Sequence, residues 1–578
     1  MKILIINLST GESQTRNLED PLVGGRLLSS LLVSEFVDPK CDPLGPDNAL
    51  VFASGPLSNM RTSTGSRLSV GCKSPLTKGI KEANAGGMAG DSISGLGDRA
   101  IVFLGSLPKD KHAIGILNSS RFELDYELVN QCWGKGNEDT AKILLEKFGK
   151  DYCVICIGQA GEQLMKASGI AVTDSEGNPF RLAARGGVGA VMGSKGLKAI
   201  LIQRPAKAST SVEKDARTNI TAFNKHVATS ERVQVLREYG TASTVMPVQI
   251  MGGLPVRNFS KGQLEDAEPI GGDFMRATIL QRDGKGTPTH ACMTGCVIQC
   301  SNAFADESGE LLAAPLEFET IGLCGSNLEI VSLDEIAKIN RLCNDFGLDT
   351  IEVGAALGVL MEAAEMQDIP SKFNRTDLPV FGSSLNALKI LSEIPLGTEL
   401  AKLVGNGVVF AGNALGVKHI PAVKGQAMSA YDPRVVKGTG VTYATSPQGA
   451  DHTAGLTVFF PVDHRDAKNA VNLSKRAQLQ RAAYDALGLC AFNTSATGQR
   501  PDIVLNMLRG VYNVELSENW MDLLGRRVID VERAFNKAAG LTKEDDRIPK
   551  YFTQDALTQP LESVFDVLES EMDTMWDS

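Results

Sequence analysis

The chain has 578 residues, 43% of them hydrophobic, which is enough for about three or four domains with large buried cores. Its formal net charge of −10 argues against a general nucleic-acid binder, and no apolar run reaches the roughly 18 residues that a membrane span requires. The first residues lack the apolar core of a secretory signal, and the eleven cysteines form no dense framework of pairs. We therefore expect a cytoplasmic protein whose thiols bind metals or pack in the core.

Residues 1–203 are rich in glycine and in short runs of strand-forming residues. Apolar segments such as residues 3–7 and 49–53 end at turn residues, a pattern that predicts strands joined by turns. Cys153 and Cys156 form a Cys-x-x-Cys, which could indicate a redox or zinc site. They stand inside an apolar run that ends at a glycine, however, and this favours a buried strand.

Three glycine-rich segments lie in the same region, at residues 55–67, 84–90 and 184–200. Glycine lets the main chain approach a ligand closely and present its N–H groups to an anion. The last segment resembles a dinucleotide fingerprint, but it has one residue too many before its last glycine and ends a β-rich region instead of opening it. The alternative is a phosphate-binding loop with three nearby cations, Arg185, Lys195 and Lys198.

From about residue 204 the pattern becomes helical. Ser332 is an N-cap candidate that precedes apolar residues at helical spacing, and a further boundary falls near residues 413–420. The predicted fold class is α+β. Three domains are expected, a β-rich N-terminal base and two mainly α-helical domains, at residues 1–203, 204–416 and 417–578.

Cys292, Cys296 and Cys300 follow one another with gaps of three residues. Three thiols so close in one chain indicate a soft metal or an iron–sulfur cluster. A cubane cluster normally takes four thiolates, and Cys490 is the candidate for the fourth. Three alternatives stay open: a zinc site with His290 as fourth ligand, a set of buried structural cysteines, and a radical-SAM site. Zinc sites more commonly use gaps of two residues between cysteines. The radical-SAM signature also ends with a gap of two residues, whereas the last gap here has three.

One internal pattern occurs twice in the helical part. Residues 344–349 and residues 485–490 both read Asx-x-x-Gly-Leu-(Asp/Cys). Two similar loops at the ends of two helices could bind two similar halves of one cofactor.

Short motifs recur in one order along nearly the whole chain: Asn7-Leu-Ser-Thr-Gly11, Gly55-Pro-Leu57, Lys73-Ser-Pro-Leu-Thr77, Arg185-Gly-Gly-Val-Gly-Ala-Val-Met-Gly-Ser-Lys195, Gly347-Leu-Asp-Thr350, Tyr431-Asp-Pro-Arg434, Tyr443-Ala-Thr445 and Asp485-Ala-Leu-Gly-Leu-Cys490. In this order they resemble the tungsten-containing aldehyde ferredoxin oxidoreductases. They are highly specific for the family and much less specific for a substrate.

The resemblance implies a bis-pyranopterin that holds tungsten or molybdenum, one 4Fe-4S cluster, and a Mg²⁺ ion that joins the pterin phosphates. It implies that the phosphates and the magnesium meet Arg67, Asn84 and Arg185. It implies that the two pterins bind to Asn344, Asp349, Asp485 and Leu489. The implied cluster ligands are Cys292, Cys296, Cys300 and Cys490. The metal and the cluster are then expected near the junction of all three domains.

The chain departs from the family pattern at three places. The cysteine triplet opens with a three-residue gap where the family has two, and we expect the cluster to survive because Gly295 can bend the longer loop. Asn344 stands where an aspartate is usual. Lys338 and Arg341 replace the glutamate and histidine through which some members share a metal between subunits, so we expect no metal-bridged dimer of that type.

The implied reaction converts an aldehyde and water to a carboxylic acid and passes electrons through the cluster to ferredoxin or a ferredoxin-like subunit. Glu319 and His452 match the catalytic pair, with the carboxylate as base for water and the imidazole as hydrogen-bond donor to the carbonyl oxygen or as proton shuttle. Glu317 and His464 are the alternatives for these roles. Two other functions stay open: the catalytic subunit of a complex that reduces an aromatic acyl-CoA, and a non-catalytic iron–sulfur protein.

The acidic C-terminal segment is a candidate for binding a partner protein. Apolar residues recur at helical spacing at Val564, Leu568, Met572 and Met575, with Trp576 beside them. The segment is either a solvated terminal helix or a helix that docks on a partner. A homo-oligomer or a hetero-oligomer is compatible with this pattern.

Overall fold

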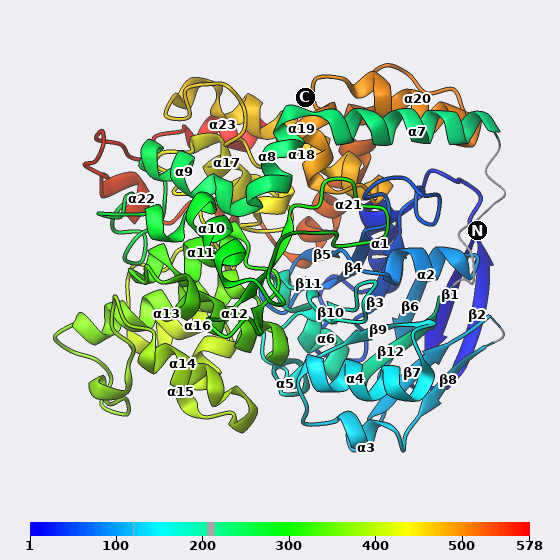
Figure 1. Ribbon diagram of the computed structural model, residues 1–578, viewed down its shortest axis with the longest axis horizontal. Coiled ribbons are helices and arrows are strands. Elements are labelled where there is room, and N and C mark those ends of the chain that lie inside the picture. The colour runs from blue at the N-terminus through cyan, green and yellow to red at the C-terminus, as the bar shows by residue number, and fades with distance from the viewer. Residues whose placement is uncertain (120, 205–213, 578) are drawn as a thin grey trace.

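The computed structural model describes residues 1–119, 121–204 and 214–577. Figure 1 shows the strands of the N-terminal region, blue to cyan, on one side of the molecule and the later helices, green to red, beside and above them. The structure confirms the predicted α+β class. The proposed boundary between residues 203 and 204 adjoins residues 205–213, which lie outside the described part of the chain, and the domain limits stay predictions.

The N-terminal region contains two six-stranded sheets with one topology. Their orders are β2-β1-β6-β3-β4-β5 and, read in the matching direction, β8-β7-β12-β9-β10-β11. In each sheet, the strand that comes first along the chain pairs in parallel with the strand that comes last: β1 with β6, and β7 with β12. All other neighbouring strands are antiparallel. We call residues 2–104 the first half and residues 113–203 the second half of this duplicated region.

The strands of the first half are β1 (Lys2–Asn7), β2 (Glu12–Asn17), β3 (Leu50–Ser54), β4 (Leu68–Lys73), β5 (Ile80–Ala85) and β6 (Asp98–Leu104). Those of the second half are β7 (Ala113–Leu117), β8 (Phe122–Asp125), β9 (Tyr152–Cys156), β10 (Ile170–Val172), β11 (Arg181–Ala183) and β12 (Leu197–Gln203). Because β9, β10 and β11 run antiparallel to their neighbours, residues 150–200 do not form a doubly wound parallel sheet. The dinucleotide-binding alternative is therefore not supported.

Helices cover the two sheets at matching places. They are α1 (Gly25–Phe36), α2 (Ala89–Gly95), α3 (Val129–Cys132), α4 (Asn137–Phe148), α5 (Gln159–Glu162) and α6 (Val188–Ser194). The helix α1 packs on the outer face of the first sheet and α4 on that of the second, while α2 and α6 add to the core between the sheets. The polar edge strand β2 is exposed along its whole length, which suits an edge that must not pair further.

Cys153 and Cys156 lie in β9, as the apolar run predicted. Residues three apart in a strand point to opposite faces, and the two thiols belong to different cores, one between the sheets and one beneath α4. Burial raises the pKa of each thiol to about 12. The pair is therefore unsuited to a common redox or metal site.

The rest of the chain is mainly helical. Its helices before residue 420 are α7 (Lys214–Thr229), α8 (Glu231–Tyr239), α9 (Val245–Met251), α10 (Gly272–Arg282), α11 (Phe318–Cys324), α12 (Leu333–Phe346), α13 (Thr350–Glu365), α14 (Leu385–Ser392), α15 (Glu399–Gly405) and α16 (Val408–Leu415). The later helices are α17 (Lys437–Thr445), α18 (Ala470–Leu487), α19 (Thr494–Thr497), α20 (Pro501–Tyr512), α21 (Trp520–Ala539), α22 (Tyr551–Gln554) and α23 (Glu569–Thr574). Two small sheets join β13 (Thr287–His290), β14 (Ser301–Ala305) and β15 (Leu311–Ala313), and β16 (Ala422–Val423) with β17 (Gln426–Ala427).

Segments distant in sequence pack together in this helical part. Figure 1 shows α7 and α20 side by side along the top, and α18 packs against α1, α17 and α21. The helix α18 therefore links the first half of the duplicated region to the C-terminal helices. Across the described residues, every helix is too short or too polar to cross a membrane.

Of the two alternatives for the C-terminal segment, the docking helix is not supported, because its apolar residues do not form one exposed helical face. Only residues 569–574 are helical there, and Met572, Met575 and Trp576 are at most 5% exposed. The ring of Trp576 lies near the cations of Lys475 and Arg533. The tail thus buries Met572, Met575 and Trp576 against its own chain, whereas Leu568 is 60% exposed.

Candidate active site

One cavity of about 680 Å³ lies where the duplicated region meets the helical part. Most of the residues that the sequence singled out line its walls: Arg67, Asn84, Arg185, Asn344, Asp349, Asp485, Glu319, His452, Cys292, Cys300 and Cys490. Leu489 is buried beside the wall and Cys296 contacts Cys292. The folded chain therefore gathers residues from all three predicted domains around one space.

The two repeated loops end their helices in the same way. We call residues 344–349, after α12, loop 1 and residues 485–490, after α18, loop 2. Gly347 and Gly488 adopt left-handed conformations, with φ of 74° and 71°. The next leucine donates its N–H to the carbonyl five residues earlier, at 2.7 Å in loop 1 and 2.9 Å in loop 2. This is the hydrogen bond of a Schellman motif, in which glycine is the favoured residue.

Loop 2 docks on the first half of the duplicated region. The N–H of Arg67 donates to the carbonyl of Gly488 at 3.1 Å, and the N–H of Cys490 donates to the carbonyl of Thr64 at 3.0 Å. A Cβ atom on Gly55, just after β3, would lie 2.3 Å from a carbonyl oxygen at the end of α18. This close approach leaves no space for a side chain.

Loop 1 docks on the second half through equivalent contacts. The N–H of Gly169 donates to the carbonyl of Gly347 at 2.8 Å, and the N–H of Asp349 donates to the carbonyl of Ala167 at 2.9 Å. A Cβ atom on Gly158, just beyond β9, would lie 2.3 Å from a carbonyl oxygen at the end of α12. Each half thus carries one loop by two backbone hydrogen bonds and one glycine contact.

The glycines of residues 184–200 serve helix packing more than anion binding. Cβ atoms on Gly189 and Gly193 would lie 2.4 Å and 2.1 Å from main-chain oxygens of neighbouring segments. The ammonium groups of Lys195 and Lys198 are buried away from the cavity, where each donates to two main-chain carbonyls. The predicted phosphate-binding role is therefore wrong for these two lysines, and of the three cations Arg185 alone lines the cavity.

Arg67 and Asn84 contact each other on the wall formed by the first half. Arg67 donates from Nε to the side-chain oxygen of Asn84 and from Nη2 to its carbonyl, at 3.3 Å in the second case. The same guanidinium lies near the thiols: burial raises the pKa of Cys490, and the charge of Arg67 opposes this rise. Arg67 therefore stands between the amide and the cysteines.

Arg185 joins three segments on the opposite wall. Its Nη2 donates to the carbonyls of Ala427 and Ala450, at 2.6 Å and 2.9 Å, and its Nε lies 3.5 Å from the carboxylate of Asp349. The buried Nε and Nη1 atoms have no hydrogen-bond partner among the described residues. They remain available to an anion in the cavity.

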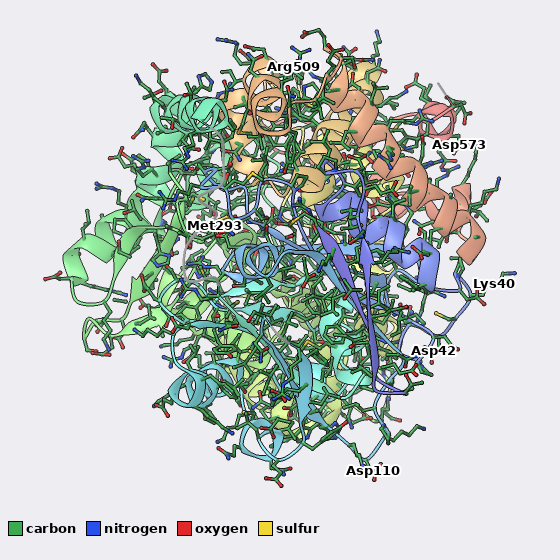
Figure 2. All side chains as sticks on the ribbon, turned by 90° about the vertical axis from the view of Figure 1, so that its right-hand side faces the viewer. Lys40, Asp42, Asp110, Met293, Arg509 and Asp573 are labelled. Atoms are coloured by element: carbon green, nitrogen blue, oxygen red, sulfur yellow. The ribbon has the colours of Figure 1, made fainter. Side chains whose placement is uncertain are left out.

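The cysteine triplet lies in a loop that contacts the first half of the duplicated region. Gly87 donates its N–H to the carbonyl of Cys292 at 2.8 Å, and Gly295 makes the bend with a φ of 75°. A hydrogen bond from Cys296 lowers the pKa of Cys292 to about 6, which favours the thiolate that metals bind. Met293, within the triplet, is 1% exposed, and Figure 2 labels it well inside the outline of the molecule.

His290 does not join these thiols. Its Nδ1 lies 2.8 Å from Nη2 of Arg181 and its Nε2 lies 3.3 Å from the carboxylate of Glu176. Among the described residues, no three His, Cys, Asp or Glu side chains form a group that could hold a single metal ion. The zinc alternative with His290 is therefore not supported, whereas the thiols of a cluster bind different iron atoms and need not converge on one point.

Glu319 and His452 have opposite shifts in pKa. Oε2 of Glu319 accepts the N–H of Ala430 at 2.8 Å, while Oε1 is buried without a partner among the described residues. Burial raises the pKa of Glu319 to about 8, against the effects of Ala430 and Arg185. Burial lowers the pKa of His452 to about 4, although Asp451 opposes it. Near pH 7 the imidazole is neutral, and the carboxyl is close to its titration range.

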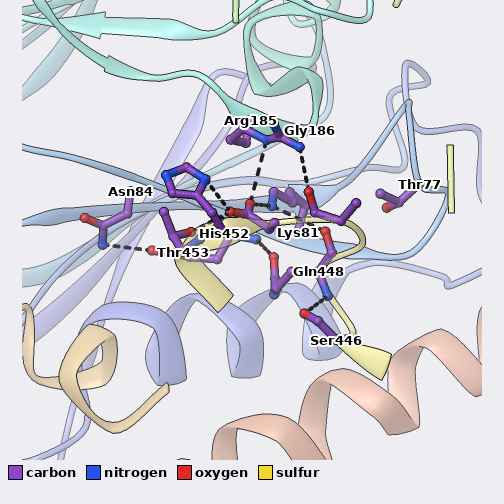
Figure 3. A network of polar contacts seen from close by, with 12 residues as sticks. Thr77, Lys81, Asn84, Arg185, Gly186, Ser446, Gln448, His452 and Thr453 are labelled. Atoms are coloured by element: carbon purple, nitrogen blue, oxygen red, sulfur yellow. Dashed lines mark hydrogen bonds and ion pairs between the residues drawn. The ribbon is translucent and has the colours of Figure 1, made fainter. Parts of the chain in front are cut away.

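A buried ionic network lies behind His452, as Figure 3 shows. Asp451 forms an ion pair with Lys81, and its Oδ1 accepts the N–H and the hydroxyl of Thr453 at 2.9 Å and 2.7 Å. The same oxygen lies 3.6 Å from Nδ1 of His452. Burial alone raises the pKa of Asp451, but Lys81 and Arg185 hold it well below its usual range. Asp451 is therefore a permanent carboxylate that orders the turn bearing His452.

The two alternatives for the catalytic pair differ in position. Glu317 lines the cavity, accepts a hydrogen bond from the hydroxyl of Thr241, and has a pKa raised by burial. His464 is outside the cavity walls. The geometry thus favours His452 over His464, and it leaves both carboxyl groups in contact with the cavity.

Sequence reasoning missed several charged residues at the site. Those in the walls are Arg181, Arg232, Asp451, Arg476 and Arg481. Asp451 could have been found from its place beside His452, and Arg481 from its place one helical turn before Asp485. Lys81 gave no signal, because the pattern of β5 shows only which face a residue occupies.

The polar atoms of the cavity suit the cofactor that the family implies. Buried atoms without a partner among the described residues include Nε and Nη1 of Arg185, Oδ2 of Asp349, Oε1 of Glu319 and Nδ1 of His452. Each such atom costs about 1–3 kcal/mol if it stays unpaired, so this number indicates a polar ligand. Guanidinium groups match phosphates, carboxylates match the N–H groups of pterin rings, and the thiols in the same cavity match a cluster.

Comparison with known families identifies matching profiles over both parts of the chain. Residues 3–204 match the profile described as aldehyde ferredoxin oxidoreductase, N-terminal domain. Residues 219–578 match the profile described as aldehyde ferredoxin oxidoreductase, domains 2 and 3.

Curated relatives are similar over almost their whole length. The chain is 31% identical to a tungsten-containing aldehyde ferredoxin oxidoreductase of Thermococcus kodakarensis, and 30% identical to that of Pyrococcus horikoshii. Both alignments cover 96% of this chain and 92% of the relative. It is also 24% identical to the WOR-like subunit of an aliphatic sulfonate oxidoreductase of Pyrococcus furiosus, over 95% of this chain and 89% of that subunit.

Among solved structures, the active-site complex BamBC of benzoyl coenzyme A reductase, bound to 1,5-dienoyl-CoA, has a similar fold. The TM-score is 0.78, the sequence identity is 18%, and the alignment covers 100% of this chain and 93% of the other. At this identity the similarity concerns the fold alone.

Proposed function

The chain belongs to the tungsten-containing aldehyde ferredoxin oxidoreductase family and is an oxidoreductase, and from this premise we propose that it oxidises an aldehyde with water to a carboxylic acid. The balanced reaction is aldehyde plus water giving acid, two protons and two electrons. The observation that carries the proposal is the shared cavity, which brings Glu319 and His452 together with the predicted pterin and cluster residues.

Membership of the family implies a tungstopterin and an iron–sulfur cluster. We assign the two pterins to loop 1 and loop 2, through Asn344, Asp349, Asp485 and Leu489. We assign the pterin phosphates and a joining Mg²⁺ to Arg67, Asn84 and Arg185. Tungsten, when bound, supplies the two-electron redox chemistry.

Glu319 and His452 divide the proton chemistry. Oε1 of Glu319 has no competing partner among the described residues, so it takes the proton of the attacking water, while the N–H of Ala430 fixes Oε2. The neutral imidazole of His452 donates a hydrogen bond to the aldehyde oxygen, and Asp451 keeps its turn in place. Both groups come from separate helical segments, so the reaction requires the folded junction.

Cys490, at the end of loop 2, would help to hold the cluster that accepts the electrons. Cys292, Cys296, Cys300 and Cys490 are the proposed ligands of one 4Fe-4S cluster. Loop 2 would then contact a pterin through Asp485 and the cluster through Cys490, which gives a short covalent connection between the two centres. Ferredoxin or a ferredoxin-like subunit is the proposed acceptor.

The test is an assay of protein produced anaerobically with tungstate. Metal analysis and pterin fluorescence establish the cofactors. Reduction of oxidised viologen measures turnover with an aldehyde, and oxidation of reduced viologen measures turnover with an aromatic acyl-CoA. Turnover with aldehydes supports the proposal. Activity confined to acyl-CoA reduction would replace it with the alternative reaction, and iron without tungsten or pterin would refute both.

A further inference from the structure

The cavity extends along α18 from an inner end at loop 2 to an outer end that opens to solvent. Residues of α18 line it from Leu473 to Asp485, a stretch of about 18 Å at the helical rise of roughly 1.5 Å per residue. Near Asp485 the cavity holds loop 2 and the thiols. At the other end Phe459 and Val462 are 50% and 41% exposed, which marks the mouth.

The outer walls carry positive charge and no acid. They are formed by residues 456–462, 473–481 and 492–499, and the only charged side chains of these segments that line the cavity are Arg476 and Arg481. The whole chain carries a formal net charge of −10. A local excess of cations in a mouth of an acidic protein indicates an anionic ligand, because a cleft of one charge sign concentrates the opposite charge.

Arg481 has unused donors inside the cavity. Its Nε and Nη1 atoms are buried and make no hydrogen bond to a described residue. Its charge acts both on His452 and on Asp485, and it lies one helical turn before Asp485 in α18. Two buried donor atoms without an acceptor are costly, so Nε and Nη1 of this half-buried side chain favour an acceptor from outside the chain.

Arg476 stands nearer the mouth. Its guanidinium lies 5.5 Å from the ring centre of Phe460, and its side chain is exposed to solvent. The ring holds the arginine side chain over the cavity without neutralising its charge. Phe460 and Leu473 supply apolar surface beside it.

We propose that Arg481 and Arg476 select aldehydes that carry a second, negatively charged group, either a carboxylate, a sulfonate or a phosphate. This inference rests on the proposed function. The aldehyde carbon lies at Glu319 and His452, the carbon chain lies against the apolar wall, and the anionic group receives the guanidinium donors. Planar guanidinium groups bind such oxyanions through two parallel hydrogen bonds.

Matched substrates test the proposal on the holoenzyme. Benzaldehyde is compared with 4-formylbenzoate and 4-formylbenzenesulfonate, and butanal is compared with 4-oxobutanoate and with glyceraldehyde 3-phosphate. We expect kcat/KM to be about tenfold or more higher for at least one anionic aldehyde than for its neutral counterpart, because charge-assisted hydrogen bonds contribute roughly 1.5–3 kcal/mol. The preferred anion then identifies the group.

Variants of the two arginines show which side chain causes the preference for anionic aldehydes. In Arg481→Gln and Arg476→Gln the ratio of anionic to neutral kcat/KM should fall about tenfold, mainly through KM. Lys468→Gln is the control, because Lys468 is an exposed cation just before α18 that does not line the cavity.

Three outcomes separate the hypotheses. Equal or better turnover of the neutral aldehydes overturns the anion preference while the proposed function stands. Loss of tungsten from Arg481→Gln, with the ratio unchanged in Arg476→Gln, also overturns it, since Arg481 then binds the cofactor. Failure of every aldehyde refutes the proposed function itself.

Discussion

Loop 1 and loop 2 are held by the same backbone contacts but end in different residues. Asp349 and Cys490 occupy equivalent places, and each donates its N–H to a carbonyl of the half that carries its loop. Asp349 accepts the N–H of Ile351 at 3.0 Å and directs its other oxygen toward Arg185. Cys490 instead lines the cavity together with Cys292 and Cys300. In the proposed assignment, one duplicated support therefore serves two different centres through a single changed residue in each loop.

The loops also differ in how their first residues are neutralised. Asp485 of loop 2 lies 3.4 Å from Arg26, which forms two hydrogen bonds of 2.8 Å with the buried Glu532. Asn344 occupies the same place in loop 1 and needs no cation. There the neighbouring Asp345 accepts the N–H of Glu138 at 2.9 Å, at the N-terminus of α4, where a helix favours negative charge. The uncharged Asn344 is thus compatible with its surroundings.

Exchanging the two end residues for serine is the strongest test of this difference. Cys490→Ser should lose most of its iron and keep tungsten, whereas Asp349→Ser should lose tungsten and pterin and keep iron, because each residue serves one centre. Metal analysis of both purified variants measures this. Full iron loading with an unchanged spectrum in Cys490→Ser would contradict the ligand assignment.

Removing the catalytic pair should affect turnover without affecting either centre. Glu319→Gln and His452→Ala should each lower aldehyde turnover by roughly 10²- to 10⁴-fold, the usual contribution of a general acid or base. Tungsten and iron contents should match the unmodified protein. His464→Ala is the matched control, since His464 lies outside the cavity walls. Near-normal turnover in either variant would remove that residue from the mechanism.

The pH dependence distinguishes the roles of the two groups. If Glu319 acts as the base, kcat/KM should fall about tenfold per pH unit below its pKa of about 8 and level off above it, because only the ionised carboxylate accepts a proton. His452, with a pKa of about 4, stays neutral from pH 5 to 9, so it adds no second change of slope to the plot of kcat/KM against pH. Glu319→Gln should abolish the slope. A rate that declines above pH 8 would make Glu319 the hydrogen-bond donor instead.

The sequence singled out the residues of the two loops that line the cavity, but not the duplicated sheets that hold these loops. The repeated Asx-x-x-Gly-Leu pattern and the cysteine spacing were readable because they depend on a few residues at fixed positions. The duplication of the sheets was not, because packing a strand requires only suitable apolar faces, which many unrelated sequences provide. Gly55 drew attention as part of a ligand-binding segment, yet it makes space for α18. Nothing in the sequence indicated that Gly158 has the equivalent place beside α12.

The smallest expected effect tests whether the two docking contacts are equivalent. Gly55→Ala and Gly158→Ala should each lower the free energy of unfolding by about 1–3 kcal/mol, since each new Cβ would overlap a main-chain oxygen and force the loop to shift. Gly253→Ala is the control, because its Cβ would have ordinary contacts of 3.4 Å or more. Thermal unfolding of the loaded protein measures these changes.

The double variant then shows whether the loops act independently. The two losses should add to within about 0.5 kcal/mol if each half supports its own loop, as distant sites usually do. A larger deviation would mean that the loops are coupled through the cavity they share. If alanine were tolerated at Gly158 but not at Gly55, only loop 2 would depend on close backbone contact, and the structural equivalence of the halves would not extend to their energetics.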